Sequence, residues 1–434
     1  MNYQINQFAK PLIIQSYQIR RFYIENVTST TKYIKGVIKN MGNKLKIYML
    51  AFLGFLAGTA EYVIAGILDQ VADSTHVSVA AAGQLITIFS IGFAFGTPVF
   101  MMIAAKMERR RLLILSLVFI VIGSLMTVVL PGFSLLVVSR VILAIGAGGF
   151  VITAMTVSSN LVPSDRQGGA IATIFAGFSA SLILGIPIGR VIAAAYDWKL
   201  IFLGIGILNL MGILAIIKNI PVTRAEAPAP LRQQLAFLKQ PKIALALGIT
   251  FFVFTGYSML NTYMAPYLSS VMGLSEHIIS GIFLALGIGC LIGTKFGGTI
   301  GDRIGYGRTI IIAIVMQFLI FILLSALFSI SSGPIAVTIG IMLLMIWTMV
   351  SWAFGTVQNT SLATITPEAA GIILSLNSSF VHIGVAAGAG MGGIVLDGPS
   401  VVAISWIGSI PAAIAIVISI ISFKLNRSHE KEGY

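Results

Sequence analysis

Apolar runs of about 20 residues recur along the whole chain, the length that a helix needs to cross about 30 Å of hydrocarbon. Of the 434 residues, 57% are hydrophobic and only 9% are charged, which excludes a soluble globule. Strand-like alternation of apolar and polar residues is absent, so the pattern favours helices over a barrel. We therefore predict an all-α membrane protein that crosses the bilayer many times.

The apolar pattern predicts twelve transmembrane helices. We place them at roughly 47–68, 80–104, 112–130, 135–158, 168–193, 200–218, 243–266, 278–299, 309–330, 335–358, 370–395 and 401–424.

The excess of 27 basic over 14 acidic residues would suit a nucleic-acid binder, but the position of the charges indicates a membrane partner instead. With these spans, nearly all basic residues fall in loops on one side of the membrane. The opposite loops carry Arg190 and Lys199 beside the acids Asp69, Asp73, Asp197, Glu276 and Asp397. The positive-inside rule then predicts a multi-pass protein of the inner, or cytoplasmic, cell membrane with both termini in the cytoplasm and no nucleic-acid partner.

Composition divides the chain into five segments: a basic cytoplasmic extension (1–46), a six-helix half (47–218), a proline-rich cytoplasmic linker (219–242), a second six-helix half (243–424) and a cytoplasmic tail (425–434). Met41 directly precedes the first span, so translation from Met1 and translation from Met41 both remain open. The two halves echo each other, which indicates an internal repeat.

The clearest echo is a glycine- and charge-rich stretch after the second span of each half. In the second half it reads Gly298-Thr-Ile-Gly-Asp-Arg-Ile-Gly-Tyr-Gly-Arg308, and in the first half Lys106-Met-Glu-Arg-Arg-Arg111. The second copy resembles the signature loop of the major facilitator superfamily, G-x-x-x-D-R-x-G-x-x-R, and this resemblance implies a twelve-helix, two-halved fold. The first copy is degenerate. The candidate gating residues are Gly298, Gly301, Asp302, Arg303, Gly305 and Arg308, together with Arg109 and Arg110.

We expect the Gly298–Arg308 stretch to be a tight cytoplasmic reversal between two membrane helices. Glycine permits a positive φ, the arginines resist translocation, and Asp302 is placed to cap the following helix.

Two further stretches resemble a branch of bacterial efflux proteins within that superfamily, which includes arabinose efflux permeases and purine efflux pumps. One is Gly58-Thr-Ala-Glu-Tyr-Val-Ile-Ala-Gly66 in the first span, and the other is Gly185-Ile186-Pro187-Ile188-Gly189 in the fifth, followed by Trp198-Lys-Leu-Ile-Phe202. The second resembles the Gly-Pro motif of drug:proton antiporters, although Ile186 separates glycine from proline. Pro187 should disrupt the helix and free a carbonyl.

Small residues recur at every fourth position in three spans and form one stripe along each helix. They are Gly177, Ser181, Gly185 and Gly189 in the fifth span; Gly281, Ala285, Gly289, Gly293 and Gly297 in the eighth; and Gly384, Gly388 and Gly392 in the eleventh. Such stripes let helix backbones approach closely, either for static packing or for sliding.

Three ionisable residues inside the spans are candidates for proton coupling. Glu61 is the one acid well inside an apolar span, and Arg140 resembles the intramembrane arginine of the superfamily's fourth helix. Charge at this depth is costly, so each residue needs a partner or a function. We expect Glu61 and Arg140 to pair, and protonation of Glu61 to release the arginine; a permanent, purely structural pair is the alternative. His382 is either a proton carrier or a hydrogen bonder between helices.

Aromatic and amide side chains in the spans suit a flat, weakly polar ligand. The candidate substrate-binding residues are Tyr62, Tyr257, Asn261, Tyr263, Trp347, Gln358 and Asn377.

The sequence contains no Walker-type phosphate loop, a single cysteine (Cys290) and four scattered histidines, so we expect no ATPase, no cofactor, no metal centre and no enzyme. We expect a monomeric secondary transporter, energised by protons, that exports small organic molecules such as purines, sugars or drugs. A proton-coupled importer of the same fold is the alternative.

Overall fold

The computed structural model describes residues 42–163, 166–222, 236–366, 369–398 and 401–432, and this part of the chain is helical throughout. Twelve of its helices are long and apolar enough to cross a membrane. They are Gly42–Gly66, Val79–Ile103, Arg109–Val129, Phe133–Asn160, Gln167–Ala195, Lys199–Asn219, Pro241–Thr262, Glu276–Ile304, Tyr306–Ile330, Pro334–Ile365, Ala370–Leu396 and Ala403–Ser422. The predicted all-α fold with twelve spans is confirmed.

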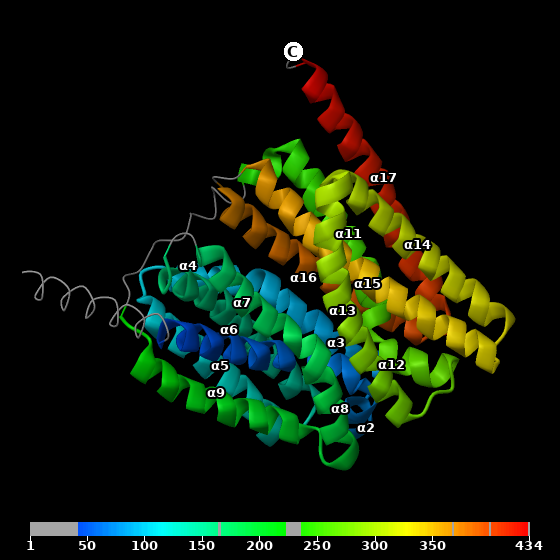
Figure 1. Ribbon diagram of the computed structural model, residues 1–434. Coiled ribbons are helices and arrows are strands. Elements are labelled where there is room, and N and C mark those ends of the chain that lie inside the picture. Colours follow the sequence, from blue (N-terminus) through cyan, green and yellow to red (C-terminus); the bar gives the residue numbers. More distant parts are fainter. Residues whose placement is uncertain (1–41, 164–165, 223–235, 367–368, 399–400, 433–434) are drawn as a thin grey trace, which may run out of the picture.

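Figure 1 follows these spans through the chain. After the first span come α2 (Leu68–Thr75), α3 (Val79–Ile91), η1 (Gly92–Gly96), α4 (Thr97–Ile103), α5 (Arg109–Val129), α6 (Phe133–Asn160), α7 (Gln167–Ala180), η3 (Ser181–Gly185), α8 (Ile186–Ala195) and α9 (Lys199–Asn219). These elements form the N-half. The C-half contains η4 (Phe237–Lys239), α11 (Pro241–Thr262), α12 (Met264–Pro266), η5 (Tyr267–Val271), α13 (Glu276–Ile304), α14 (Tyr306–Ile330), α15 (Pro334–Ile365), α16 (Ala370–Leu396) and α17 (Ala403–Glu432).

The observed helices extend past several predicted ends. The eighth continues to Ile304 and the tenth to Ile365, beyond the predicted limits of 299 and 358. A helix satisfies its own backbone hydrogen bonds, so it can continue past the hydrocarbon, where hydropathy no longer marks it. Most of the predicted N-terminal extension and the central part of the predicted linker lie outside the described residues. The boundaries of the five predicted segments remain predictions.

The signature stretch is more compact than the predicted loop. Gly298 and Gly301 lie within α13, and the reversal takes place at Gly305, whose φ of 90° favours glycine. The prediction that Asp302 caps the next helix is wrong. α13 ends at Ile304, so Asp302 lies in its last turn, and Gly305 is the residue that precedes α14. The Asp302 carboxylate accepts a hydrogen bond from the Tyr306 hydroxyl at 3.1 Å.

The small-residue stripes pack helices within each half. A Cβ on Gly177 would lie 2.2 Å from the Ala51 carbonyl oxygen of the first span, and one on Gly388 would lie 2.2 Å from the Thr255 oxygen of α11. A Cβ on Gly293 would lie 2.1 Å from the Met349 oxygen of α15. The stripes therefore join the fifth span to the first, the eleventh to the seventh and the eighth to the tenth. This arrangement favours static close packing.

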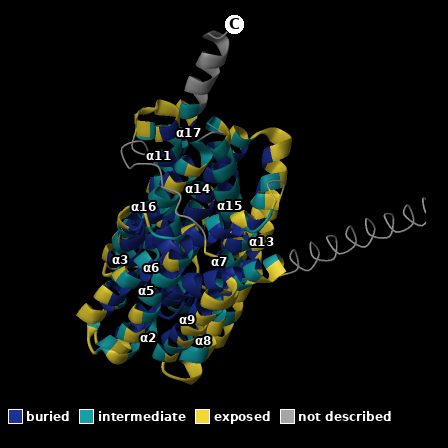
Figure 2. Cartoon of the chain, turned by 90° about the vertical axis from the view of Figure 1, so that its left-hand side faces the viewer, coloured by how far each residue is buried: buried dark blue, intermediate teal, exposed yellow. Residues whose placement is uncertain are grey.

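The two ends of the bundle differ in charge. The basic end carries the loops around Lys106 and Arg303, and the acidic end carries Asp69, Asp197 and Glu276. At the acidic end, α2 of the N-half lies beside α12 of the C-half (Figure 1). Buried residues fill the middle of the bundle and exposed residues cover its outer faces (Figure 2). The halves meet where α3 packs on α16 and where η3 and α8 pack on α13.

Candidate functional site

Glu61 and His382 face each other across the interface between the halves. Glu61 comes from the first span and His382 from α16, and both side chains are more than nine-tenths buried. The Glu61 Oε1 to His382 Nδ1 distance is 3.8 Å, and neither Glu61 Oε2 nor His382 Nδ1 has a hydrogen-bond partner among the described residues. The His382 ring stacks on Phe93 of η1, with ring centroids 3.8 Å apart. A carboxyl group with this little solvation is suited to changing its protonation when its surroundings change.

Arg140 of α6 contacts the first span at the residue before Glu61 and is 1% exposed. Its Nη1 donates to the Ala60 carbonyl at 2.9 Å, and its guanidinium lies 4.6 Å from the centre of the Phe202 ring. Arg140 forms no ion pair within the described part of the chain, so the expected pair with Glu61 is not formed in this conformation. Its Nε and Nη2 have no hydrogen-bond partner there. Arg140 instead holds the backbone of the residue that precedes Glu61.

Three of the aromatic candidates lie near this centre. Tyr257 of α11 stacks on Trp347 of α15 with centroids 5.0 Å apart, and its hydroxyl donates to Asn261 at 3.2 Å. Tyr62 packs edge-on against Phe178 of α7 at 5.8 Å and lies within electrostatic range of Glu61 and Tyr257. Tyr62 and Tyr257 are half-buried, so the fold presents aromatic rings from both halves beside the Glu61 carboxyl.

The other candidates are engaged elsewhere. Gln358 donates to Thr250 at 3.0 Å and to the Ala246 carbonyl, and Thr250 donates to Asn377 at 2.7 Å, in a network inside the C-half. Tyr263 is buried and donates to the Ala389 carbonyl at 2.8 Å. In these positions Gln358, Asn377 and Tyr263 join helices, and the structure does not bring them to the Glu61 carboxyl.

Among the motif residues, Arg110 donates to the Ile217 carbonyl at the end of α9, and Arg109 is buried. Arg303 and Arg308 are exposed at the basic end. In the fifth span, the π-helix η3 ends at Gly185, and Pro187 lies in the first turn of α8. A Cβ on Gly185 or Gly189 would meet Thr59 or Val63 of the first span within 3 Å.

Sequence patterns did not identify two contacts at this interface. Phe93 is one of many apolar residues of its span, and nothing marks it as the partner of His382. Pro98 of α4 has no N–H to donate to the Ala94 carbonyl four residues earlier, and the Ser379 hydroxyl of α16 donates to that oxygen at 3.4 Å. The proline was a usable signal for the second contact.

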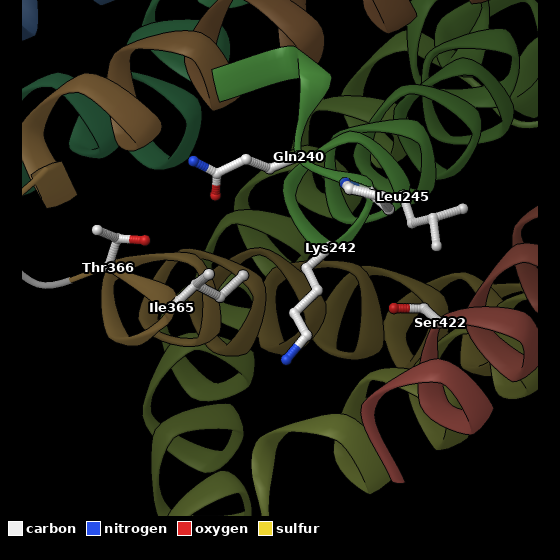
Figure 3. A pocket seen from close by; sticks show the side chains of 7 residues that line it. Gln240, Lys242, Leu245, Ile365, Thr366 and Ser422 are labelled. Atoms are coloured by element: carbon white, nitrogen blue, oxygen red, sulfur yellow. The ribbon is translucent and has the colours of Figure 1, made fainter. Parts of the chain in front are cut away.

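A pocket of about 370 Å³ lies within the C-half at the basic end, away from this centre (Figure 3). It is lined at the start of α11, at the end of α15 and along α17, by Gln240, Lys242, Leu245, Ile365, Thr366 and Ser422, among others. No group of three or more His, Cys, Asp or Glu side chains that could hold a metal ion occurs among the described residues.

Comparisons with known proteins agree with this architecture. The chain is 42% identical over 383 residues to an uncharacterized MFS-type transporter, YbcL, of Bacillus subtilis (strain 168), which covers 88% of this chain and 97% of the relative. Its fold is similar to that of a mutant of the nucleoside transporter NupG, with a TM-score of 0.69 and 15% identity over 88% of this chain and 100% of the other.

A second similar structure is a bacterial homolog of the human lysosomal transporter Spinster, in an inward-facing and unoccupied conformation. It has a TM-score of 0.61 and 19% identity over 88% of this chain and 95% of the other. At these identities the two structures support the fold alone. The sequence profile of the Major Facilitator Superfamily matches residues 50–389. The chain therefore belongs to the Major Facilitator Superfamily and is a multi-pass membrane transporter.

Proposed function

We propose that the protein is a proton-coupled antiporter that exports small organic molecules such as purines, sugars or drugs, and that it acts as a monomer with the basic end in the cytoplasm. The observation that carries this proposal is the Glu61 carboxyl, which is 9% exposed and faces His382 of the other half. A titratable pair at the interface between two moving halves is a means of coupling protons to movement.

The coupling follows from the position of the pair. When the halves rock about their interface, the distance between Glu61 and His382 and their access to water change together. A carboxylate without its partner in an apolar bundle is costly, so movement that separates the pair favours protonation of Glu61. Proton binding and release are then linked to which side of the membrane the site faces.

Arg140 contacts the backbone next to Glu61. Its bond to the Ala60 carbonyl fixes the first span next to Glu61, and its own charge rests against the Phe202 ring. The half-buried rings of Tyr62 and Tyr257 offer flat surfaces on which an aromatic or ring-shaped cargo can stack. These contacts favour small cyclic organic molecules as cargo.

The test replaces Glu61 by Gln in protein reconstituted in liposomes. A panel of purine analogues, sugars and antibiotics is first screened in cells that lack or overproduce the protein, with and without an uncoupler, to find a transported compound. For that compound, Glu61→Gln should reduce proton-driven accumulation to the level of protein-free liposomes, because the amide cannot exchange a proton. Exchange of labelled for unlabelled cargo without a gradient should persist.

Glu108→Gln is the matched control, because Glu108 precedes α5 at the basic end and pairs locally with Arg111 at 3.5 Å. It should leave proton-driven accumulation unchanged. Full accumulation by Glu61→Gln would rule out this carboxyl as the coupling site.

A further inference from the structure

A buried arginine joins the two halves at the acidic end of the bundle. Arg190 lies in α8, and its side chain is 4% exposed. Its guanidinium donates to the Gly66 carbonyl at the end of the first span, to the Ser280 hydroxyl at 3.1 Å and to the Glu276 carboxylate. It also lies 5.5 Å from the centre of the Phe283 ring. One side chain of the N-half thus contacts one face of α13 in the C-half.

The spacing of these partners shows why the contact is specific. Glu276, Ser280 and Phe283 follow one another at four and three residues, which places them on one face of a helix. The planar guanidinium has several N–H donors in a fixed arrangement, so a single arginine satisfies carboxylate, hydroxyl and carbonyl acceptors together. Further along α13, a Cβ on Gly287 would lie 2.6 Å from the Ile183 Cα of η3, which directly precedes α8. The backbones of α13 and of the fifth span therefore approach each other closely at Gly287.

The exposure of the partners indicates that the contact can open. The Glu276 side chain is 56% exposed, so water can solvate its carboxylate when the ion pair with Arg190 breaks. Asp69 follows the first span and lies within electrostatic range of both Glu276 and Arg190. Its burial raises its pKa most, and the negative charge of Glu276 raises the pKa further. When α8 leaves α13, Arg190 keeps the Gly66 carbonyl and has Asp69 within electrostatic range. Arg190 then has polar partners both when α8 packs on α13 and when the two helices are apart.

We propose that Arg190 is the latch of the outer gate: its contacts with Glu276 and Ser280 hold the acidic end closed, and their release opens the central site to the exterior. This inference rests on the proposed alternating access and on the placement of the acidic end outside the cell. It concerns the conformational equilibrium, so it can be tested without cargo.

The chain contains its own reporter for this test. Cys290 is the single cysteine of the sequence, is 8% exposed, and lies on α13 within electrostatic range of Tyr62 and Tyr257. A membrane-impermeant maleimide added outside right-side-out vesicles reaches this thiol only when the acidic end opens. The rate of Cys290 labelling therefore reports the open population, and Cys290→Ser gives the background.

Glu276→Gln and Arg190→Ala should each accelerate external labelling of Cys290, by about tenfold for Arg190→Ala, which corresponds to about 1.4 kcal/mol. Glu276→Gln alters a half-exposed side chain and is not expected to impair folding. Arg190→Lys should be intermediate, because an ammonium keeps the charge but not the fork. Lys199→Ala, a cation at the same end that forms no ion pair among the described residues, should label at the wild-type rate.

Labelling from the basic end, in inside-out vesicles, separates gate opening from unfolding. Gate opening should leave that rate unchanged or lower it, whereas an unfolded variant labels faster from both sides. Unchanged external labelling in Glu276→Gln and in folded Arg190→Ala would overturn the latch. Faster external labelling together with full proton-driven transport by Glu61→Gln would retain the latch and reject the proposed coupling.

Discussion

Individual residues determine the chemistry at the centre of this transporter, and His382 is the most informative of them. Its ring has two distinct contacts: the stack on Phe93 at 3.8 Å and the approach of Nδ1 to the Glu61 carboxyl, also at 3.8 Å. The stack positions α16 against η1 through an apolar surface, whereas the nitrogen can respond to a proton. A substitution can separate these two roles.

His382→Phe should fold as the wild type does but lose most proton-driven accumulation. Phenylalanine keeps a flat ring against Phe93 and removes the nitrogen that faces Glu61. The melting temperature in detergent and accumulation in proteoliposomes, measured side by side, check this expectation. His382→Ala, which removes ring and nitrogen together, should lose stability as well. A fully coupled His382→Phe transporter would mean that the histidine only packs.

At the scale of the elements, close backbone contacts hold each half together as a unit. The eighth span approaches the tenth at Gly293 and Gly297, and the fifth approaches the first at Gly177. Contacts this short leave no room for a side chain, so the neighbouring backbone must move if one is added. In the proposed coupling, rigid halves would transmit a change at Glu61 to the ends of the helices, whereas loosely packed halves would absorb it.

Gly293→Ala should therefore destabilise the protein by about 1–3 kcal/mol, the usual cost of forcing a methyl group into a packed interface. The new Cβ would lie 2.1 Å from the Met349 carbonyl oxygen, which belongs to the backbone and cannot rotate away. Thermal unfolding in detergent provides the measurement. Gly281→Ala on the same helix meets no atom within 4 Å and should melt like the wild type. Equal melting of the two variants would contradict the packing argument.

At the scale of the whole molecule, the two halves form one interface that is held at the acidic end by Arg190 and near the centre by Glu61, His382 and Ser379. We propose that the basic end lies in the cytoplasm, as the positive-inside rule predicts. A proton entering from the acidic end and leaving at the basic end would move one half relative to the other. Cargo that moves against this proton flux is exported, and cargo that moves with it is imported.

The vesicle lumen of inside-out membranes corresponds to the cell exterior, so an acidified lumen should drive accumulation of cargo inside them. The proton gradient supplies the energy, and an uncoupler should abolish the accumulation. Radiolabelled cargo, filtered from vesicles with and without the protein, gives the measurement. Accumulation in right-side-out vesicles under an external acid gradient would instead identify an importer of the same fold.

The spans were predictable because a bilayer imposes strong local requirements: about 20 apolar residues per crossing and internally satisfied backbone groups. These requirements act within each segment, so hydropathy alone located the twelve helices; the largest differences lie at the start of the first and at the ends of the eighth and tenth. The reversal within Gly298–Arg308 and the close approach of helices at the glycine stripes were also predicted, although the turn is confined to Gly305.

The partners of the buried charges were decided by the tertiary structure alone. The sequence determined that Glu61 and Arg140 are costly inside a membrane, but not that Glu61 faces His382 and Arg140 faces Ala60 and Phe202. Nor did it distinguish Arg190 from other basic residues near a loop, although this residue joins the halves. Hydropathy and periodicity report the surroundings of one helix, whereas these contacts depend on how helices distant in the chain are arranged around it.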